Sequence, residues 1–197
     1  SQLDHLKPLN PYGWSKHLFD QRVAHLAMDP RTRPPQYVGL KFFNVYGPNE
    51  YHKGLMKSVV AQKYPAAELG KPVTLFRSYR PDCEDGGQQR DFIYVRDCAD
   101  VMLWLFDNPE VNGLFNLGTG QARSFADLAK ALFSALGKTS QIQYIDMPSS
   151  IRDRYQYFTE AQMLQLRSAG YAAPFTSLEA GISDYINNFL ATTDPYL

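Results

Sequence analysis

The stretch RDFIYVRDCADVMLWLFDNPEVNGLFNL at residues 90–117 decides the fold class of this chain. Residues 91–95 are an apolar run that predicts a buried strand, and the segment that begins at Asp97 has the apolar spacing of a helix. Asp97, with a second aspartate three places later, resembles a capping box at the start of that helix. Residues 114–117 then predict another strand. A strand, a helix and a strand in this order favour an α/β fold around parallel strands.

The same alternation extends outward in both directions along the chain. Further strands are predicted at 37–43, 73–76 and 141–145. Further helices are predicted from Asn10 to about Met28, over a segment with Met56, Val59 and Val60 facing inward, and after Ser124, Thr159 and Ser177. The connections 44–54 and 77–89 are predicted loops, and the second is long enough to suggest a functional role. No linker or repeat interrupts the pattern, so residues 1–197 are predicted to form one unit.

The composition excludes several classes of protein. Hydrophobic residues make up 44% of the 197 residues and charged residues 20%, which is ordinary for a folded globular domain. Twenty Lys and Arg balance twenty Asp and Glu, so the net charge of zero argues against nucleic acid as a partner. No apolar run approaches the ~18 residues that a membrane helix needs, and no membrane partner is expected.

Cysteine and histidine usage favours a cytoplasmic protein without a metal ion. Cys83 and Cys98 are too few and too poorly spaced for a disulfide framework or a zinc site, so we expect reduced thiols. The four histidines lack metal-ligand spacing. The first residues do not have the basic and apolar regions of a signal peptide. A cytoplasmic location is therefore expected.

Tyr12 and Lys16 form a Y-x-x-x-K pair on the first predicted helix. The helical stripe that contains both continues with Phe19, Val23 and Leu26, so we expect it to be buried. A cation four residues after a tyrosine stabilises the phenolate and lowers its pKa, which makes the tyrosine a usable acid–base catalyst. The alternative is a structural tyrosine packed over a lysine stem.

Gly118-Thr119-Gly120 follows a predicted strand and precedes a predicted helix, as dinucleotide-binding loops do. The third small residue of that fingerprint is replaced by Arg123, and few residues remain beyond it for a complete nucleotide fold. We predict a strand-to-helix turn beside a site rather than the primary cofactor loop.

An ordered set of motifs points to a known family. The motifs are PYGWSK at 11–16, FFNVYGP at 42–48, RDFIYVRDCADV at 90–101, FNLGTG at 115–120 and RYQ at 154–156. This set resembles the extended short-chain dehydrogenase/reductase family, the nucleotide-sugar epimerases and dehydratases. More specific stretches resemble the members that act on an ADP-activated heptose: NVYGPNEYHKG at 44–54, RYQYFTEA at 154–161 and AGYAAPFTSLEAGISDYI at 169–186.

The resemblance implies both a fold and an activity. The fold would be the C-terminal part of a Rossmann-type, doubly wound parallel sheet, with a smaller α/β substrate-binding region at about 54–90 and 141–197. The missing N-terminal half, with its glycine-rich loop, would belong to the same enzyme. The activity would be inversion of C6 of ADP-glycero-manno-heptose, a lipopolysaccharide precursor, with NADP as cofactor and NAD possible. The alternatives are a UDP-hexose 4-epimerase or related dehydratase, and an inactive sugar-nucleotide-binding fragment.

The resemblance also assigns roles to individual residues. Tyr12 and Lys53 would be the two acid/base groups, because reduction from the opposite face requires proton transfer on a different side. Lys16, Val45 and Lys53 would contact the cofactor. The substrate would be bound by Asn44, Leu55, Gln62, Phe76, Arg77, Ser78, Tyr79, Arg90 and Tyr155, which include aromatic rings for the base and arginines for the phosphates.

Several assignments have a simpler structural alternative. Lys53 could be a solvated loop lysine, Phe76 and Tyr79 could be core residues, and Arg90 could pair only with Asp91 or a surface acid. The chain also departs from the family at Leu55 and Gln62, where a small polar residue and a histidine are expected, and its 80–89 segment is longer. An apolar stripe without a partner surface favours a homo-oligomer.

Overall fold

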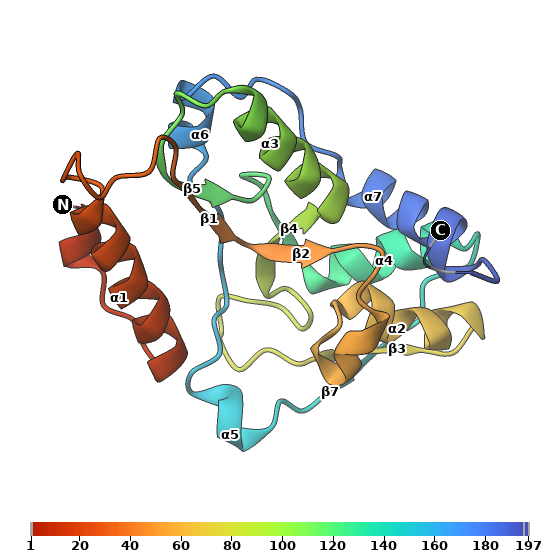
Figure 1. Cartoon of the computed structure of the whole chain (residues 1–197). Coiled ribbons are helices and arrows are strands. Elements are labelled where there is room, and N and C mark those ends of the chain that lie inside the picture. Colours follow the sequence, from red (N-terminus) through yellow and green to blue (C-terminus); the bar gives the residue numbers. More distant parts are fainter. Residues whose placement is uncertain (1, 195, 197) are drawn as a thin grey trace.

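Paired strands form the centre of the computed structural model, which describes residues 2–194 and 196 (Figure 1). The strands are β1 Val38–Phe42, β2 Asn44–Tyr46, β3 Val73–Phe76, β4 Gln89–Tyr94, β5 Gly113–Leu117, β6 Ala122–Ser124 and β7 Ile142–Ile145. Strand β1 pairs with β5, β2 with β4 and β3 with β7, all in parallel. The predicted α/β class with parallel strands is confirmed. The short antiparallel pairing of β6 with β4 was not predicted.

Helices pack around these strands. They are α1 Pro11–Leu26, α2 Val59–Glu68, α3 Val95–Asp107, α4 Phe125–Ala135, α5 Ser149–Arg152, α6 Leu164–Ser168 and α7 Leu178–Tyr185. Short 3-10 helices cover Gln2–His5 and Tyr51–Met56, and a π-helical turn covers Ile186–Leu190. Among the described residues, no helix has the length and apolar character needed to cross a bilayer.

Three helix starts follow the predicted capping chemistry. The Asn10 side chain accepts a hydrogen bond from Gly13 N–H at 2.8 Å, and Pro11 is the first residue of α1. Ser124 and Asp127 form a complete capping box at the start of α4. Ser177 caps α7, whose stripe of Leu178, Ile182 and Tyr185, continued by Phe189, is buried as predicted.

Three expectations about helix boundaries were wrong. Helix α3 begins at Val95, and Asp97 does not cap it, because its carboxylate instead accepts hydrogen bonds from Thr176 N–H and Oγ1. The helix expected after Thr159 begins at Leu164, since the backbone at Thr159 is bonded to strand β4. Met56 precedes α2 and its side chain is 83% exposed.

Strand β4 lies between two hydrophobic clusters. Phe92 and Tyr94 belong to a cluster with α2, α4, α7 and β3. Ile93, between them, belongs to a second cluster with α3, β5 and α6. Successive strand side chains point to opposite faces, so β4 is covered on both sides. This buried central strand carries Arg90 and Asp91 to the site described below.

The predicted burial of the Tyr12 stripe of α1 was also wrong. Tyr12 is 74% exposed and Phe19 67% exposed. The buried residues of α1 are instead His17 and Asp20, and Asp20 forms an ion pair with Lys41 of β1. A polar contact thus attaches α1, at one side of the molecule in Figure 1, and leaves its apolar residues uncovered in this chain.

Candidate functional site

A small cavity, here called the aromatic cavity, brings together several of the predicted substrate residues. Its volume is about 240 Å³. Residues of α2, β3, β7 and the start of α4 line it, together with one residue just before β4 and one after α5: Val59, Gln62, Lys63, Thr74, Leu75, Phe76, Gln88, Phe125, Ile145 and Tyr155. Phe76 and Tyr155 meet edge to face across it, with ring centroids 6.1 Å apart. Flat apolar walls of this kind suit a stacked ring.

Arg90 lies behind two of the rings that line this cavity. Its guanidinium carbon is 5.2 Å from the centre of the Tyr155 ring and 5.7 Å from that of Phe125. The residue is only 9% exposed, and burial lowers the pKa of its guanidinium. Within the described part of the chain, no carboxylate lies at ion-pair distance from it. A buried cation without a counter-charge favours an anionic ligand such as a phosphate.

The alternative that Arg90 pairs with Asp91 is therefore wrong. Each oxygen of the buried Asp91 carboxylate already accepts two hydrogen bonds: Oδ1 from Thr119 N–H and Oγ1, and Oδ2 from Gly120 N–H and Ala161 N–H, all between 2.7 and 3.0 Å. These bonds occupy the amides of the glycine turn at 118–120. The turn connects β5 to the short strand β6, which precedes α4, so the predicted direct strand-to-helix turn was wrong. Its Thr119 and Gly120 amides are not free to bind a phosphate.

The segment that follows β3, here called the edge of the site, continues directly from Phe76, although Arg77, Ser78 and Tyr79 do not line either cavity. Arg77 is exposed and lies 3.9 Å from Asp146. Ser78 N–H donates to Asp85 Oδ1 at 2.7 Å. The Tyr79 hydroxyl donates to Asp146 at 3.0 Å, and the guanidinium of Arg152 stacks 3.8 Å from the centre of the Tyr79 ring. Tyr79 is thus not a core residue.

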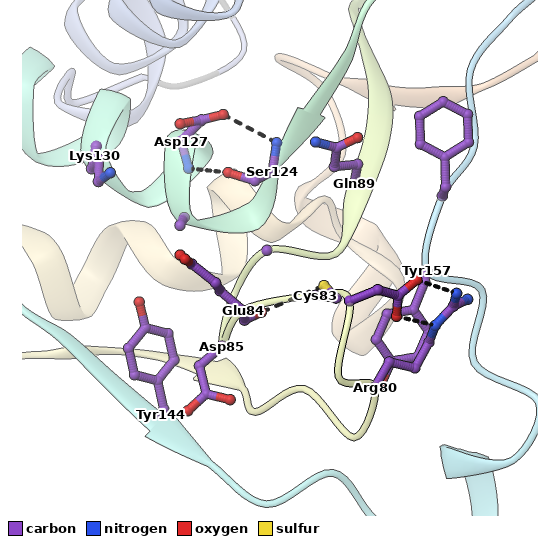
Figure 2. Close-up of a pocket in the computed structure, with 14 residues that line it drawn as sticks. Arg80, Cys83, Glu84, Asp85, Gln89, Ser124, Asp127, Lys130, Tyr144 and Tyr157 are labelled. Atoms are coloured by element: carbon purple, nitrogen blue, oxygen red, sulfur yellow. Dashed lines mark hydrogen bonds and ion pairs between the residues drawn. The ribbon is translucent and has the colours of Figure 1, made fainter.

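Figure 2 shows a second, polar cavity, whose volume is about 600 Å³. The loop between β3 and β4 supplies much of its wall, together with the start of α4 and Tyr157. Arg80 forms an ion pair with Asp82. Figure 2 shows Arg80 beside the Tyr157 ring. Four segments separate the two cavities, because each has one residue that lines the aromatic cavity and a nearby residue that lines the polar cavity. In that order the pairs are Gln88 and Gln89, Phe125 and Ser124, Ile145 and Tyr144, and Tyr155 and Tyr157. These segments are here called the partition.

The remaining predicted site residues do not line the aromatic cavity, apart from Gln62. Asn44 is exposed and Val45 half-buried on β2, in register with Phe92 and Ile93 of β4. Lys53 and Leu55 are exposed on the 3-10 helix, and Leu55 is 92% exposed. The Gln62 side chain donates to the carbonyls of Leu55 and Lys57, which attaches this segment to α2.

Tyr12 and Lys16 are adjacent on α1. Lys16 Nζ lies 5.3 Å from the centre of the Tyr12 ring. Within the described residues, no carboxylate forms an ion pair with Lys16, so its ammonium is available to a ligand. The contact between the two side chains fits both the acid–base pair and the structural alternative, and the surface that they occupy is exposed.

The sequence did not indicate three residues that organise the site. Glu50 is buried and accepts hydrogen bonds from Ser58 N–H, Ser58 Oγ and Tyr185 Oη, which anchors the segment carrying Lys53. Asp91 holds the glycine turn, and Tyr157 contacts the loop after β3. Most of the partners of these three residues are distant in sequence. The only local signal is for Asp91, a charged residue in a strand that is otherwise apolar from Phe92 onward.

Comparison with known proteins gives consistent matches. A protein from Nitratidesulfovibrio vulgaris strain DP4 named ADP-L-glycero-D-manno-heptose-6-epimerase is 53% identical over 98% of this chain and 58% of its own length. One of the same name from Fusobacterium nucleatum is 46% identical over 100% of this chain and 60% of its own length. The chain thus spans about three fifths of the length of these curated relatives.

Solved structures of epimerases also match this chain. The Helicobacter pylori ADP-L-glycero-D-manno-heptose-6-epimerase matches with a TM-score of 0.72 and 31% identity, over 92% of this chain and 52% of that one. The Thermus thermophilus UDP-glucose 4-epimerase, solved in complex with NAD, matches with a TM-score of 0.71 and 26% identity, over 92% and 54%. The model of the NAD dependent epimerase/dehydratase family covers residues 1–118, which include Tyr12, Lys16 and strands β1 to β5. The chain belongs to the NAD dependent epimerase/dehydratase family.

Proposed function

We propose that the protein inverts C6 of an ADP-activated heptose by oxidising that carbon and reducing it again from the opposite face. The main observation that supports a nucleotide-sugar ligand is the environment of Arg90. This buried cation has no counter-charge among the described residues and lies behind the rings of the aromatic cavity. The identity to heptose epimerases over nearly the whole chain supports the sugar and the C6 position.

The substrate would span the aromatic cavity and the edge formed after β3. Phe76 and Tyr155 would contact the base or sugar rings, and Arg90 would neutralise the diphosphate. Arg77, Ser78 and Tyr79 would bind the nucleotide end. Asn44, Leu55 and Gln62 would lie nearer the sugar.

The chemistry would involve Tyr12 and Lys16 of α1 together with the segment that carries Asn44 and Lys53. A nicotinamide cofactor, NADP by preference, supplies the hydride acceptor and donor when bound. Lys16, whose ammonium has no acidic partner among the described residues, fits a role in holding its ribose, beside Val45 and Lys53. Tyr12 would move the hydroxyl proton on one face and Lys53 on the other.

We further propose that a longer protein surrounds this chain. The exposed apolar residues of α1 would pack against an upstream half that supplies the rest of the cofactor site, or against a second copy in a homo-oligomer. A cytoplasmic location agrees with a nucleotide-sugar substrate.

The test is to incubate the full-length protein with ADP-D-glycero-D-manno-heptose and, in parallel, with UDP-glucose, and to determine the C6 and C4 configurations of the products by NMR. Conversion of the heptose alone is expected. Lys53→Ala should abolish it, while Lys71→Ala, a matched exposed lysine, should not. Turnover of UDP-glucose alone, undisturbed by Lys53→Ala, would favour the 4-epimerase. Binding of nucleotide without turnover of either sugar would favour the inactive sugar-nucleotide-binding protein.

A further inference from the structure

The loop between β3 and β4 meets the segment carrying Tyr155 at Tyr157. The Tyr157 hydroxyl oxygen accepts a hydrogen bond from Tyr79 N–H at 2.9 Å. The Tyr157 ring packs edge-on against the Tyr155 ring, with centroids 6.0 Å apart and planes at 85°. The Tyr157 carbonyl accepts a hydrogen bond from Gln89 N–H at 2.8 Å. One residue thus contacts both the nucleotide edge at Tyr79 and the wall of the aromatic cavity at Tyr155.

The loop itself is a compact unit that covers Tyr157. The Arg80 guanidinium carbon lies 5.1 Å from the centre of the Tyr157 ring, and Asp82 holds that guanidinium through bonds of 2.9 and 2.6 Å (Figure 2). Inside the loop, Asp85 accepts a hydrogen bond from Ser78 N–H. The far end of the loop is held separately, because Gly86 N–H donates to the Phe76 carbonyl and the Gly86 carbonyl accepts a hydrogen bond from Ala126 N–H. The bond to Tyr157 therefore concerns the first part of the loop, around Tyr79.

We propose that Tyr157 is a positioning residue for the nucleotide-sugar site, whose hydroxyl fixes the backbone at Tyr79 and whose ring fixes Tyr155. The proposal rests on the proposed function, since it concerns the same ligand. Tyr157 lines the polar cavity, on the other side of the partition, and therefore acts through its two neighbours.

This role predicts an effect on binding rather than on the chemical step. Without the Tyr157 hydroxyl, the backbone at Tyr79 loses one of the contacts that hold it, so it must be ordered when the ligand binds, and the ordering costs affinity. The reacting carbon is distant from the nucleotide end. Loss of the Tyr157 hydroxyl should therefore weaken ground-state and transition-state binding alike, which raises KM and leaves kcat nearly unchanged.

The experiment compares Tyr157→Phe with Tyr144→Phe in the full-length protein. Tyr144 lines the same cavity, and its hydroxyl makes no hydrogen bond with any residue that the structure describes. The measurements are Kd for ADP and for UDP by calorimetry, KM and kcat for the ADP-heptose, and hydrogen exchange of the Tyr79 amide without ligand. For Tyr157→Phe we expect Kd for ADP and KM to rise roughly five- to tenfold, kcat to stay within about twofold, and Tyr79 exchange to accelerate. Tyr144→Phe should change none of these.

Each contrary result overturns a defined part of the inference. Faster Tyr79 exchange with unchanged Kd and KM would mean that the loop is held but does not position the ligand. A higher KM with unchanged exchange, or a lower melting temperature alone, would also overturn the proposal. A wild type that binds ADP but leaves the heptose unchanged would refute the proposed function, and Kd and exchange would still test Tyr157. A wild type that binds neither nucleotide would overturn both.

Discussion

The guanidinium of Arg90 lies against the ring of Tyr155, although one residue belongs to β4 and the other follows α5. Tyr155 is in turn edge-on to Phe76 at the end of β3. Burial raises the pKa of the Tyr155 phenol, so this residue stays neutral and does not neutralise Arg90. The positive charge of Arg90 therefore has no counter-charge among the described residues.

Replacement of Arg90 tests this arrangement. We expect Arg90→Gln to weaken ADP binding by about 1.5–3 kcal/mol, the usual contribution of a hydrogen bond to a charged group. Arg90→Lys should restore only part of the lost affinity, because a lysine lacks the planar guanidinium that can donate two hydrogen bonds to a diphosphate. Calorimetric titration measures the change, with exposed Arg33→Gln as the control. Equal affinity in Arg90→Gln and wild type would exclude Arg90 from the ligand site.

Asp91 should be required for stability rather than for binding. Each of its carboxylate oxygens accepts two hydrogen bonds, and an asparagine can accept on one side only. Asp91→Asn is expected to lower the free energy of unfolding by about 2–4 kcal/mol, measured by urea denaturation. Asp107→Asn, on the exposed end of α3, is the control. The prediction fails if both variants unfold at the same urea concentration as wild type.

Buried tyrosines should make the fold sensitive to alkali. Burial raises the pKa values of Tyr46, Tyr94 and Tyr185, and that of Tyr64 to about 12. The folded state therefore keeps protons that the unfolded state releases near pH ~10. The resulting stability is fully present below that pH and is lost as the pH rises above it. Denaturation at pH 8, 9, 10 and 10.5 should show a falling free energy of unfolding only in the upper part of this range.

The two cysteines should differ in reactivity. Burial raises the pKa of the Cys98 thiol to about 12, and the side chain is nearly inaccessible. Cys83 is half-buried in the loop between β3 and β4. Iodoacetamide at pH 8 should therefore modify Cys83 in the folded protein and Cys98 only after unfolding, because the thiolate is the reactive form. Peptide mass spectrometry locates the adducts, and labelling of folded Cys83→Ser at Cys98 would contradict the prediction.

Local patterns predicted those elements whose determinants are close in sequence. Strand β3 lies where the apolar run predicted it, and the Ser124 capping box starts α4. Predictions failed where a polar side chain has a distant partner. Asp97 bonds Thr176 instead of capping α3, and Asp20 bonds Lys41, so α1 faces the strands with polar residues and exposes Tyr12. Helical periodicity cannot reveal these bonds.

The candidate site was also predictable from the sequence only in part. The residue types at Phe76, Arg90 and Tyr155, and the resemblance that their motifs carry, were available from the sequence alone. Their arrangement was decided by the tertiary structure: Phe76 and Tyr155 come from distant segments to line one cavity, and Arg90 packs against the Tyr155 ring without lining it. The sequence determines which residue types are available, here aromatic rings and an arginine. Burial and the pairing of distant segments decide which of them come into contact.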